Sequence, residues 1–174
     1  MILNDKEIKK QCIDNNMIVG WQERYQYTIK TSAMQIALSG GLSYHSYDVS
    51  LRGVKPMLDI NKREIPNRYL ASTVESFNLP KNVTGTLYNK STLARLGIKQ
   101  PQTIIEAGWS GRSLTLEIEL PSTFECNEGL KWLEDNKGMP IASIMFQFVE
   151  PAEKGSYAGK YQGQGEDGSV VGAR

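Results

Sequence analysis

Apolar and polar residues alternate with a period of two along four short stretches of the chain. The stretches are 47–52, 69–77, 114–120 and 141–149. In the third stretch, leucine and isoleucine alternate with Thr115, Glu117 and Glu119. A period of two indicates half-buried β-strands with one face toward the core. Since proline and glycine are dense from residue 54 onward and helical periodicity is weak, the pattern predicts a mainly β fold: a sandwich, barrel or jelly roll.

A short helix is predicted near the N-terminus, over about residues 5–13. Asn4 followed three residues later by Glu7 resembles a capping pair. The apolar residues expected on one face of this helix are Ile8, Cys12 and Ile13. We expect the helix to cover one end of the core.

Length and charge narrow the function classes. The chain has 174 residues and fits one domain, residues 1–174, that can bury a real core. With 20 Lys plus Arg against 19 Asp plus Glu, the net charge of +1 favours neither nucleic acid nor an anionic membrane. The N-terminus lacks a basic region followed by a long apolar run, and no segment is apolar enough to span a membrane. We therefore expect a cytoplasmic protein.

The cysteines and the histidine exclude one kind of chemistry. Cys12 and Cys126 form no CxxC pair, which suits free thiols in a reducing compartment. Zinc-dependent base deaminases use one His and two Cys near a Glu, in an H-x-E and P-C-x-x-C pattern. His45 is the only histidine, and no Glu stands two residues after it. The sequence therefore predicts no zinc site of that type.

The middle of the chain gathers groups that suit a small-molecule site. Ser91 and Thr92 supply hydroxyls, and Lys90 and Arg95 supply positive charge that can hold phosphate. Glu117 lies on a predicted strand and, by the alternation, points away from its core face. Taken alone, each of these residues also fits a solvated surface, and Ser91 or Thr92 fits the cap of a short helix.

The C-terminal segment, residues 155–174, differs in composition from the rest. Five glycines lie between Gly155 and Gly168, together with two tyrosines and one lysine. We expect this segment to be a flexible lid that orders over a ligand.

Five sequence blocks together resemble the dCTP deaminases, relatives of the trimeric dUTPases. The blocks are Met1–Asp5, Ser46–Arg52, Lys90–Gly97, Gly108–Gly111 with Leu114–Glu117, and Tyr157–Gln164. The resemblance implies a distorted jelly roll, assembled as a homotrimer whose active sites are shared between subunits. It also implies hydrolysis of dCTP to dUTP and ammonia, without a metal at the base and with Mg²⁺ accompanying the triphosphate.

The resemblance assigns roles residue by residue. Glu117 matches the catalytic glutamate, and Ser91 and Arg95 match the serine and arginine that support it. The positions that match substrate-binding residues of the family are Lys90, Ser91, Thr92, Arg95, Glu106, Thr115, Tyr157, Lys160 and Gln164. Glu106 departs from the pattern, because many members have an aspartate there that meets the deoxyribose.

The chemistry of deamination explains these residue types. Water must add to C4 of cytosine, the ring must be protonated and ammonia must leave, and one carboxyl group in a dry pocket can move these protons. Without zinc, the Ser91 hydroxyl is the expected holder of the water, and the Arg95 guanidinium is expected to stabilise charge around the base. Asp48 and Arg52 are expected to form a structural pair nearby.

Two other functions stay open from the sequence. One is a dUTP pyrophosphatase, or a bifunctional enzyme that forms dUMP, because dUTPases orient water with an aspartate where this chain has Glu106. The other is an inactive nucleotide-binding regulatory homologue, against which the complete set of Ser91, Arg95 and Glu117 argues.

Overall fold

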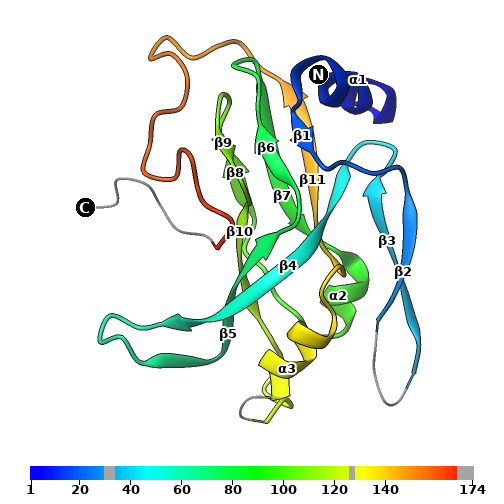
Figure 1. Cartoon of the computed structure of the whole chain (residues 1–174), viewed down its shortest axis with the longest axis vertical. Helices are drawn as coiled ribbons and strands as arrows, with labels where there is room; N and C mark the ends of the chain where they lie inside the picture. The colour runs from blue at the N-terminus through cyan, green and yellow to red at the C-terminus, as the bar shows by residue number, and fades with distance from the viewer. Residues whose placement is uncertain (30–33, 126–127, 168–174) are drawn as a thin grey trace.

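The chain folds mainly into antiparallel β-strands, as the alternating pattern predicts (Figure 1). The computed structural model describes residues 1–29, 34–125 and 128–167. Its helices are α1 (Asp5–Asn15), α2 (Ser91–Arg95) and α3 (Glu128–Asp135). Its strands are β1 (Ile18–Val19), β2 (Tyr25–Ile29), β3 (Ile36–Leu42), β4 (Tyr47–Leu58), β5 (Glu64–Thr73), β6 (Ser76–Asn78), β7 (Val83–Asn89), β8 (Thr103–Ile105), β9 (Ser110–Gly111), β10 (Thr115–Glu119) and β11 (Pro140–Phe148).

The strands of the described residues form two sheets. The larger has eight strands and runs β10-β5-β4-β11-β7-β8, with β3 pairing β4 and β2 pairing β3. The smaller has the order β1-β6-β9. The long strand β4 joins the two halves of the larger sheet, because residues 47–50 pair with β11 and residues 51–58 pair with β5. This arrangement leaves β10 at one end of the sheet order.

The core follows the predicted alternation on β10 and over most of β11, but not at the start of β4, where Asp48 and Ser50 are buried together with the apolar residues between them. On β10 Leu116 and Ile118 are buried, while Glu117 between them is exposed. On β11 the predicted inward residues Ala142, Ile144 and Phe146 are fully buried. Since a strand turns successive side chains to opposite faces, the outer face of β10 is left for polar side chains.

The N-terminal helix exists, but it is longer than predicted and one of its predicted core residues is wrong. Asn4 caps α1 by accepting a hydrogen bond from the Glu7 backbone N–H at 3.0 Å. Ile8 is buried as expected, but Ile13 is 62% exposed. Five residues correspond to about 140° around a helix, which turns Ile13 away from the face of Ile8. Gln11 lies on the buried face instead.

Two further expectations fail for local reasons. The run 69–77 is not one strand. Strand β5 ends at Thr73 and β6 begins at Ser76, and the side chain of Glu75 between them is buried. The Glu75 carboxylate accepts hydrogen bonds from the Ser50 N–H at 3.0 Å and the Tyr47 hydroxyl at 3.3 Å. Helix α3 was not predicted, since the glycines around it suggest a turn. An added Cβ at Gly129 would lie 2.6 Å from Leu120 Cδ1 and 3.1 Å from the Tyr69 hydroxyl of β5, so the glycine lets this helix pack closely against the sheet.

No helix in the described part of the chain combines the length and the apolar content needed to cross a membrane.

Candidate active site

One edge of strand β10 makes hydrogen bonds near both of its ends, at Thr115 and Glu119, and is unpaired between them, at Glu117. Its other edge pairs with β5, where Glu117 faces Leu70. On the outer edge, Glu119 exchanges two backbone hydrogen bonds of 2.9 Å with Lys99, and the Thr115 N–H donates to Gln164 Oε1 at 3.2 Å. Backbone groups two residues apart point to the same edge of a strand. The N–H and C=O of Glu117 therefore face the gap between these contacts, where no other described strand pairs.

The Glu117 side chain lines a cavity of about 350 Å³. The residues around it are Met57, Arg68, Lys99, Gln100, Pro101, Ile118 and Glu119. Glu119 is bound in two ion pairs, to Arg68 at 3.3 Å and to Lys99 at 3.5 Å. Within the described residues, Glu117 makes no ion pair and its side chain is exposed. Of the two carboxylates on this face, only that of Glu117 is without an ion pair in the described part of the chain, and it is therefore the better candidate for proton transfer.

Thr115 lies two residues away, beside a second cavity of about 400 Å³. Gly53, Ser72 and Glu166 also line it. The Thr115 hydroxyl is buried and has no hydrogen-bond partner within the described residues. An unpaired buried hydroxyl costs about 1–3 kcal/mol, so this group is a candidate to bind a ligand or a second copy of the chain.

Helix α2 presents Ser91 and Arg95 to solvent. Leu93, which is 1% exposed, anchors the helix in the core. The preceding Lys90 is not exposed, because its Nζ lies 2.7 Å from Asp48 Oδ2 and its side chain is only 10% exposed. The expected pair of Asp48 with Arg52 is therefore wrong.

Arg52 instead binds the C-terminal segment and a neighbouring turn. Its guanidinium lies 3.3 Å from the Glu166 carboxylate and donates to the backbone carbonyls of Thr73 and Val74. Arg52 thus belongs with Thr115 and Glu166, which line the same cavity.

One chain does not bring α2 together with Glu117. Ser91, Thr92 and Arg95 are not among the residues that line the Glu117 cavity. In Figure 1, α2 and the described part of the C-terminal segment, residues 155–167, lie on opposite sides of the molecule, with strands of the larger sheet between them. On this subunit the Glu117 cavity is therefore not lined by Ser91 or Arg95, the other predicted catalytic residues.

The described part of the C-terminal segment, residues 155–167, lies against β9 and the start of β10. The Gly163 N–H donates to the Ser110 carbonyl at 2.8 Å, and the Arg112 N–H donates to the Gln164 carbonyl at 2.7 Å. Gln164 is buried, whereas Lys160 is exposed. Residues 168–174 of the predicted lid lie outside the described residues.

Two other predicted binding residues, Glu106 and Tyr157, lie on segments that contact each other. Glu106 is exposed at the start of a turn that its carbonyl closes by accepting from the Trp109 N–H at 3.0 Å. The Tyr157 N–H donates to the carbonyl of Ala107 in the same turn at 3.3 Å. The fold thus brings Glu106 and the C-terminal segment side by side.

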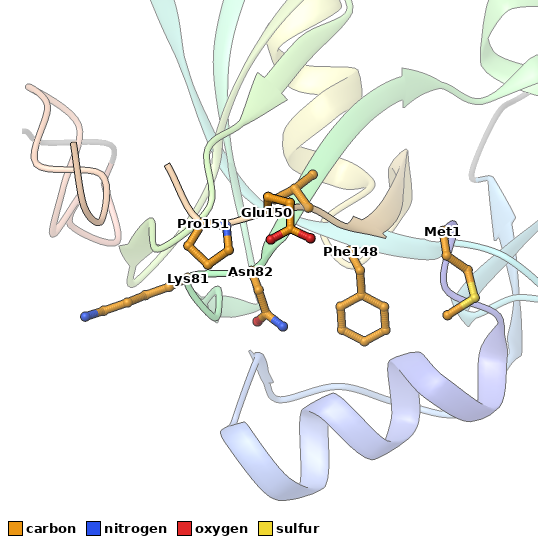
Figure 2. A pocket seen from close by; sticks show the side chains of 7 residues that line it. Met1, Lys81, Asn82, Phe148, Glu150 and Pro151 are labelled. Carbon is orange, nitrogen blue, oxygen red and sulfur yellow. The ribbon is translucent and has the colours of Figure 1, made fainter. Parts of the chain in front are cut away.

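A cavity larger than these two lies elsewhere, beside α1. Its volume is about 670 Å³. Figure 2 shows the side chains around it: Met1, Lys81, Asn82, Phe148, Glu150 and Pro151. None of the residues predicted for the site lines it, so size does not identify the active site here.

Sequence reasoning missed a buried polar cluster behind the site. Burial raises the pKa of the Glu75 carboxyl, although hydrogen bonds from the Ser50 N–H and the Tyr47 hydroxyl oppose this. Burial also raises the pKa of Tyr47, and the nearby Glu75 adds to that effect. The cluster joins β4 to the turn before β6, which the strand pattern alone does not show.

The protein is thus a mainly β protein with a candidate site for a small ligand. The unpaired backbone groups on the edge of β10 can hydrogen-bond such a ligand, and the Glu117 carboxylate can move protons on it. The family model described as dCTP deaminase-like matches residues 2–148. The chain therefore belongs to the dCTP deaminase-like family.

Named relatives agree with this family. The chain is 28% identical to the dCTP deaminase of Pyrobaculum arsenaticum over 177 residues, covering 94% of this chain and 93% of that protein. It is 31% identical over 193 residues to the dCTP deaminase of Pseudomonas fluorescens strain Pf0-1, covering 94% and 95%. A 37% match over 115 residues reaches "dCTP deaminase, dUMP-forming" of Methanosphaerula palustris, covering 61% and 58%.

A solved structure shares the fold. The crystal structure of 2'-deoxycytidine 5'-triphosphate deaminase from Agrobacterium tumefaciens aligns with a TM-score of 0.52 and 16% identity. The alignment covers 85% of this chain and 48% of that chain.

Proposed function

We propose that this protein hydrolyses dCTP to dUTP and ammonia, with Glu117 as the general acid and base. Membership of the dCTP deaminase-like family supports the substrate. The observation that carries the role of Glu117 is its exposed carboxylate, which makes no ion pair within the described residues, on the residue whose backbone N–H and C=O face the unpaired part of the β10 edge.

The reaction needs two proton transfers that one carboxylate can make. Glu117 takes a proton from water as the water oxygen bonds to C4, and gives it to N3 of the ring. It then moves the proton of the new hydroxyl to the amino group, and the C4–N4 bond breaks to release ammonia. The backbone N–H and C=O of Glu117 at the open edge are suited to hydrogen-bond a planar base.

The proposed site is completed by a second copy of the chain. Glu117 is exposed and α2 does not reach its cavity, so one subunit provides neither a dry pocket nor the Ser91 and Arg95 contacts. A neighbouring α2 supplies both in a homotrimer, the assembly that the jelly-roll resemblance implies. Excluding water strengthens the electrostatic effect of Arg95 on the developing charge.

The triphosphate brings its own metal. In the described part of the chain, no three His, Cys, Asp or Glu side chains converge into a metal cage. Mg²⁺ fits this arrangement as an ion held by phosphate oxygens, a common mode for magnesium. Thr92, Arg95 and Lys160 are exposed or half-buried and are suited to the phosphates. A cytoplasmic location, where deoxynucleotides are metabolised, stays a prediction.

A bifunctional reaction that ends at dUMP is the second candidate. The relative from Methanosphaerula palustris named as dUMP-forming favours it. Glu106, exposed on the turn that contacts the C-terminal segment, is the carboxylate positioned to orient a water toward a phosphate.

Product analysis tests these proposals. Purified protein is incubated with dCTP and Mg²⁺, and nucleotides, ammonia and pyrophosphate are measured together. Ammonia with dUTP supports the deaminase, and ammonia with dUMP and pyrophosphate supports the bifunctional enzyme. Cleavage of dUTP with dCTP untouched would show a pyrophosphatase, and inertness to both would point to the regulatory homologue.

A matched pair of variants tests the carboxylate itself. Glu117→Gln keeps the shape of the side chain and is expected to bind dCTP while losing nearly all turnover. Glu119→Gln removes the neighbouring carboxylate, which is held in ion pairs, and is expected to retain activity. A substantial rate in Glu117→Gln removes Glu117 from its proposed role.

A further inference from the structure

The buried ion pair of Lys90 with Asp48 suggests a role for both residues that differs from phosphate binding. The two charged atoms are 2.7 Å apart, and the side chains are 10% and 6% exposed. The Ser143 hydroxyl donates to the other carboxylate oxygen of Asp48. Both oxygens of Asp48 are therefore engaged, and the Lys90 ammonium is largely shielded from a ligand in solvent.

Strand register explains why this pair forms. Asp48, Ser143 and Tyr88 form one row across β4, β11 and β7. Lys90 follows Tyr88 by two residues, so its side chain starts on the same face and reaches back over Ser143. If Lys90 moved to a phosphate, Asp48 would remain as a buried unpaired charge, which is strongly unfavourable.

Lys90 is also the N-cap residue of α2, immediately before the first helical residue, Ser91. Its backbone carbonyl accepts the first helical hydrogen bond, from the Ala94 N–H at 2.9 Å, and no side chain caps this end. Ser91 and Arg95 make no side-chain hydrogen bond or ion pair within the described residues. Their orientation therefore depends on how α2 itself is held, by Leu93 in the core and by Lys90 at its start.

We propose that Asp48 is a positioning residue for the reaction. Through Lys90 it fixes the start of α2 and so the orientation of Ser91 and Arg95. Lys90 binds Asp48 and acts on catalysis through the helix, while the charge of the triphosphate is met by other residues. The proposal rests on the proposed function, because α2 must contribute to dCTP turnover.

Steady-state kinetics with Asp48→Asn, Lys90→Met and the double variant separates the two roles of Lys90. A positioning role predicts that each single change lowers kcat about tenfold or more and changes KM for dCTP less than about threefold. The double variant is expected to recover part of kcat, because it leaves no unpaired buried charge. A phosphate-binding role predicts a KM more than about tenfold higher in Lys90→Met with little effect of Asp48→Asn. That result would overturn the proposal.

Hydrogen exchange gives a readout that does not need activity. In Asp48→Asn the amides of Ala94 and Leu96, which are bonded within α2, are expected to exchange at least about fivefold faster, while β11 stays protected. Ser143→Ala, a milder change at the same carboxylate, is expected to act in the same direction. Unchanged α2 exchange in both variants refutes the positioning role.

A surface pair and the wild-type assay complete the design. Lys131→Met breaks the exposed pair of Lys131 with Asp135 and is expected to leave kcat and α2 exchange unchanged. A wild-type protein that does not deaminate dCTP would remove the proposed function. In that case faster α2 exchange in Asp48→Asn would still show that Asp48 holds the helix, so the two failures are distinguishable.

Discussion

Trp109 ties the hydrophobic core to the C-terminal segment through one hydrogen bond: its indole Nε1 donates to the backbone carbonyl oxygen of Tyr161 at 2.7 Å. The ring is 4% exposed and packs against Phe77, with ring centroids 6.0 Å apart. Trp109 is therefore a packing anchor of the core. The bond adds a second role, because it holds the segment that carries Lys160 and Gln164.

Trp109→Phe should loosen the C-terminal segment. The change keeps an aromatic ring in the core and removes the donor, a hydrogen bond that contributes about 1 kcal/mol or about fivefold in the docking equilibrium. We expect faster proteolytic cleavage after residue 155 and a KM for dCTP about fivefold higher. Phe77→Leu is the control, since it disturbs the same packing without touching the bond. Equal cleavage rates in Trp109→Phe and wild type would contradict this prediction.

Complementation between inactive variants tests whether the site is shared. Glu117→Gln retains α2, and Arg95→Ala retains the acid and base, so a mixed trimer contains a site built from the two intact halves. Random mixing of equal amounts into a cyclic trimer is expected to restore about a quarter of wild-type activity. The measurement is dCTP turnover after denaturation and refolding of the mixture, with each variant refolded alone as the control. No recovery in a verified mixed trimer would place Glu117 and Arg95 in the same subunit's site.

Local patterns predicted the strand that carries the site. The alternation along β10 placed Glu117 on the outer face, and the structure confirms this, because pleating fixes the direction of each side chain. The same logic failed where tertiary contacts decide. Asp48 and Lys90 meet across three strands, and their pairing depends on a register that sequence does not reveal.

Other misses have a similar cause. Helix α3 packs through Gly129, and a glycine chosen for close approach looks like a turn glycine in the sequence. Glu75 interrupts a run of strand-like residues, because its buried carboxylate accepts hydrogen bonds from the Ser50 N–H and the Tyr47 hydroxyl in the interior. The proposed completion of the Glu117 cavity by a neighbouring subunit is a contact between chains. The alternation of residues within one chain carries no information about such a contact.

The Cys12 thiol should be inert in the folded protein. Burial raises its pKa to about 11, although a hydrogen bond with the Ile18 backbone opposes this. At pH 8 only about one thiol in a thousand is then ionised, and the thiolate is the nucleophile. In a Cys126→Ser background, a thiol reagent is expected to label Cys12 only as the protein unfolds in urea. Rapid stoichiometric labelling under native conditions would contradict both the burial and the raised pKa.

Glu75→Gln should flatten the pH dependence of stability. Burial raises the pKa of the Glu75 carboxyl in the folded protein, so the folded state holds this proton more tightly than the unfolded state. Its contribution to the free energy of unfolding is full below the unfolded pKa of about 4.3 and is lost as pH rises through the folded value. Glutamine does not ionise. The variant is therefore expected to gain stability relative to wild type as pH rises from about 4 to 8.

Urea unfolding at several pH values measures this difference. Glu64→Gln is the matched control, because Glu64 is an exposed carboxylate at the start of β5 and the same change there alters no buried group. The free energy of unfolding of Glu75→Gln is subtracted from that of wild type at each pH. The slope of this difference against pH reports how many more protons Glu75 binds in the unfolded than in the folded state. If that difference is constant from acid to neutral pH, Glu75 titrates alike in both states and burial does not perturb it. If the difference falls with pH, the buried carboxylate weakens the link between β4 and β6 whenever it is ionised, which follows from its place beside Tyr47 and Ser50.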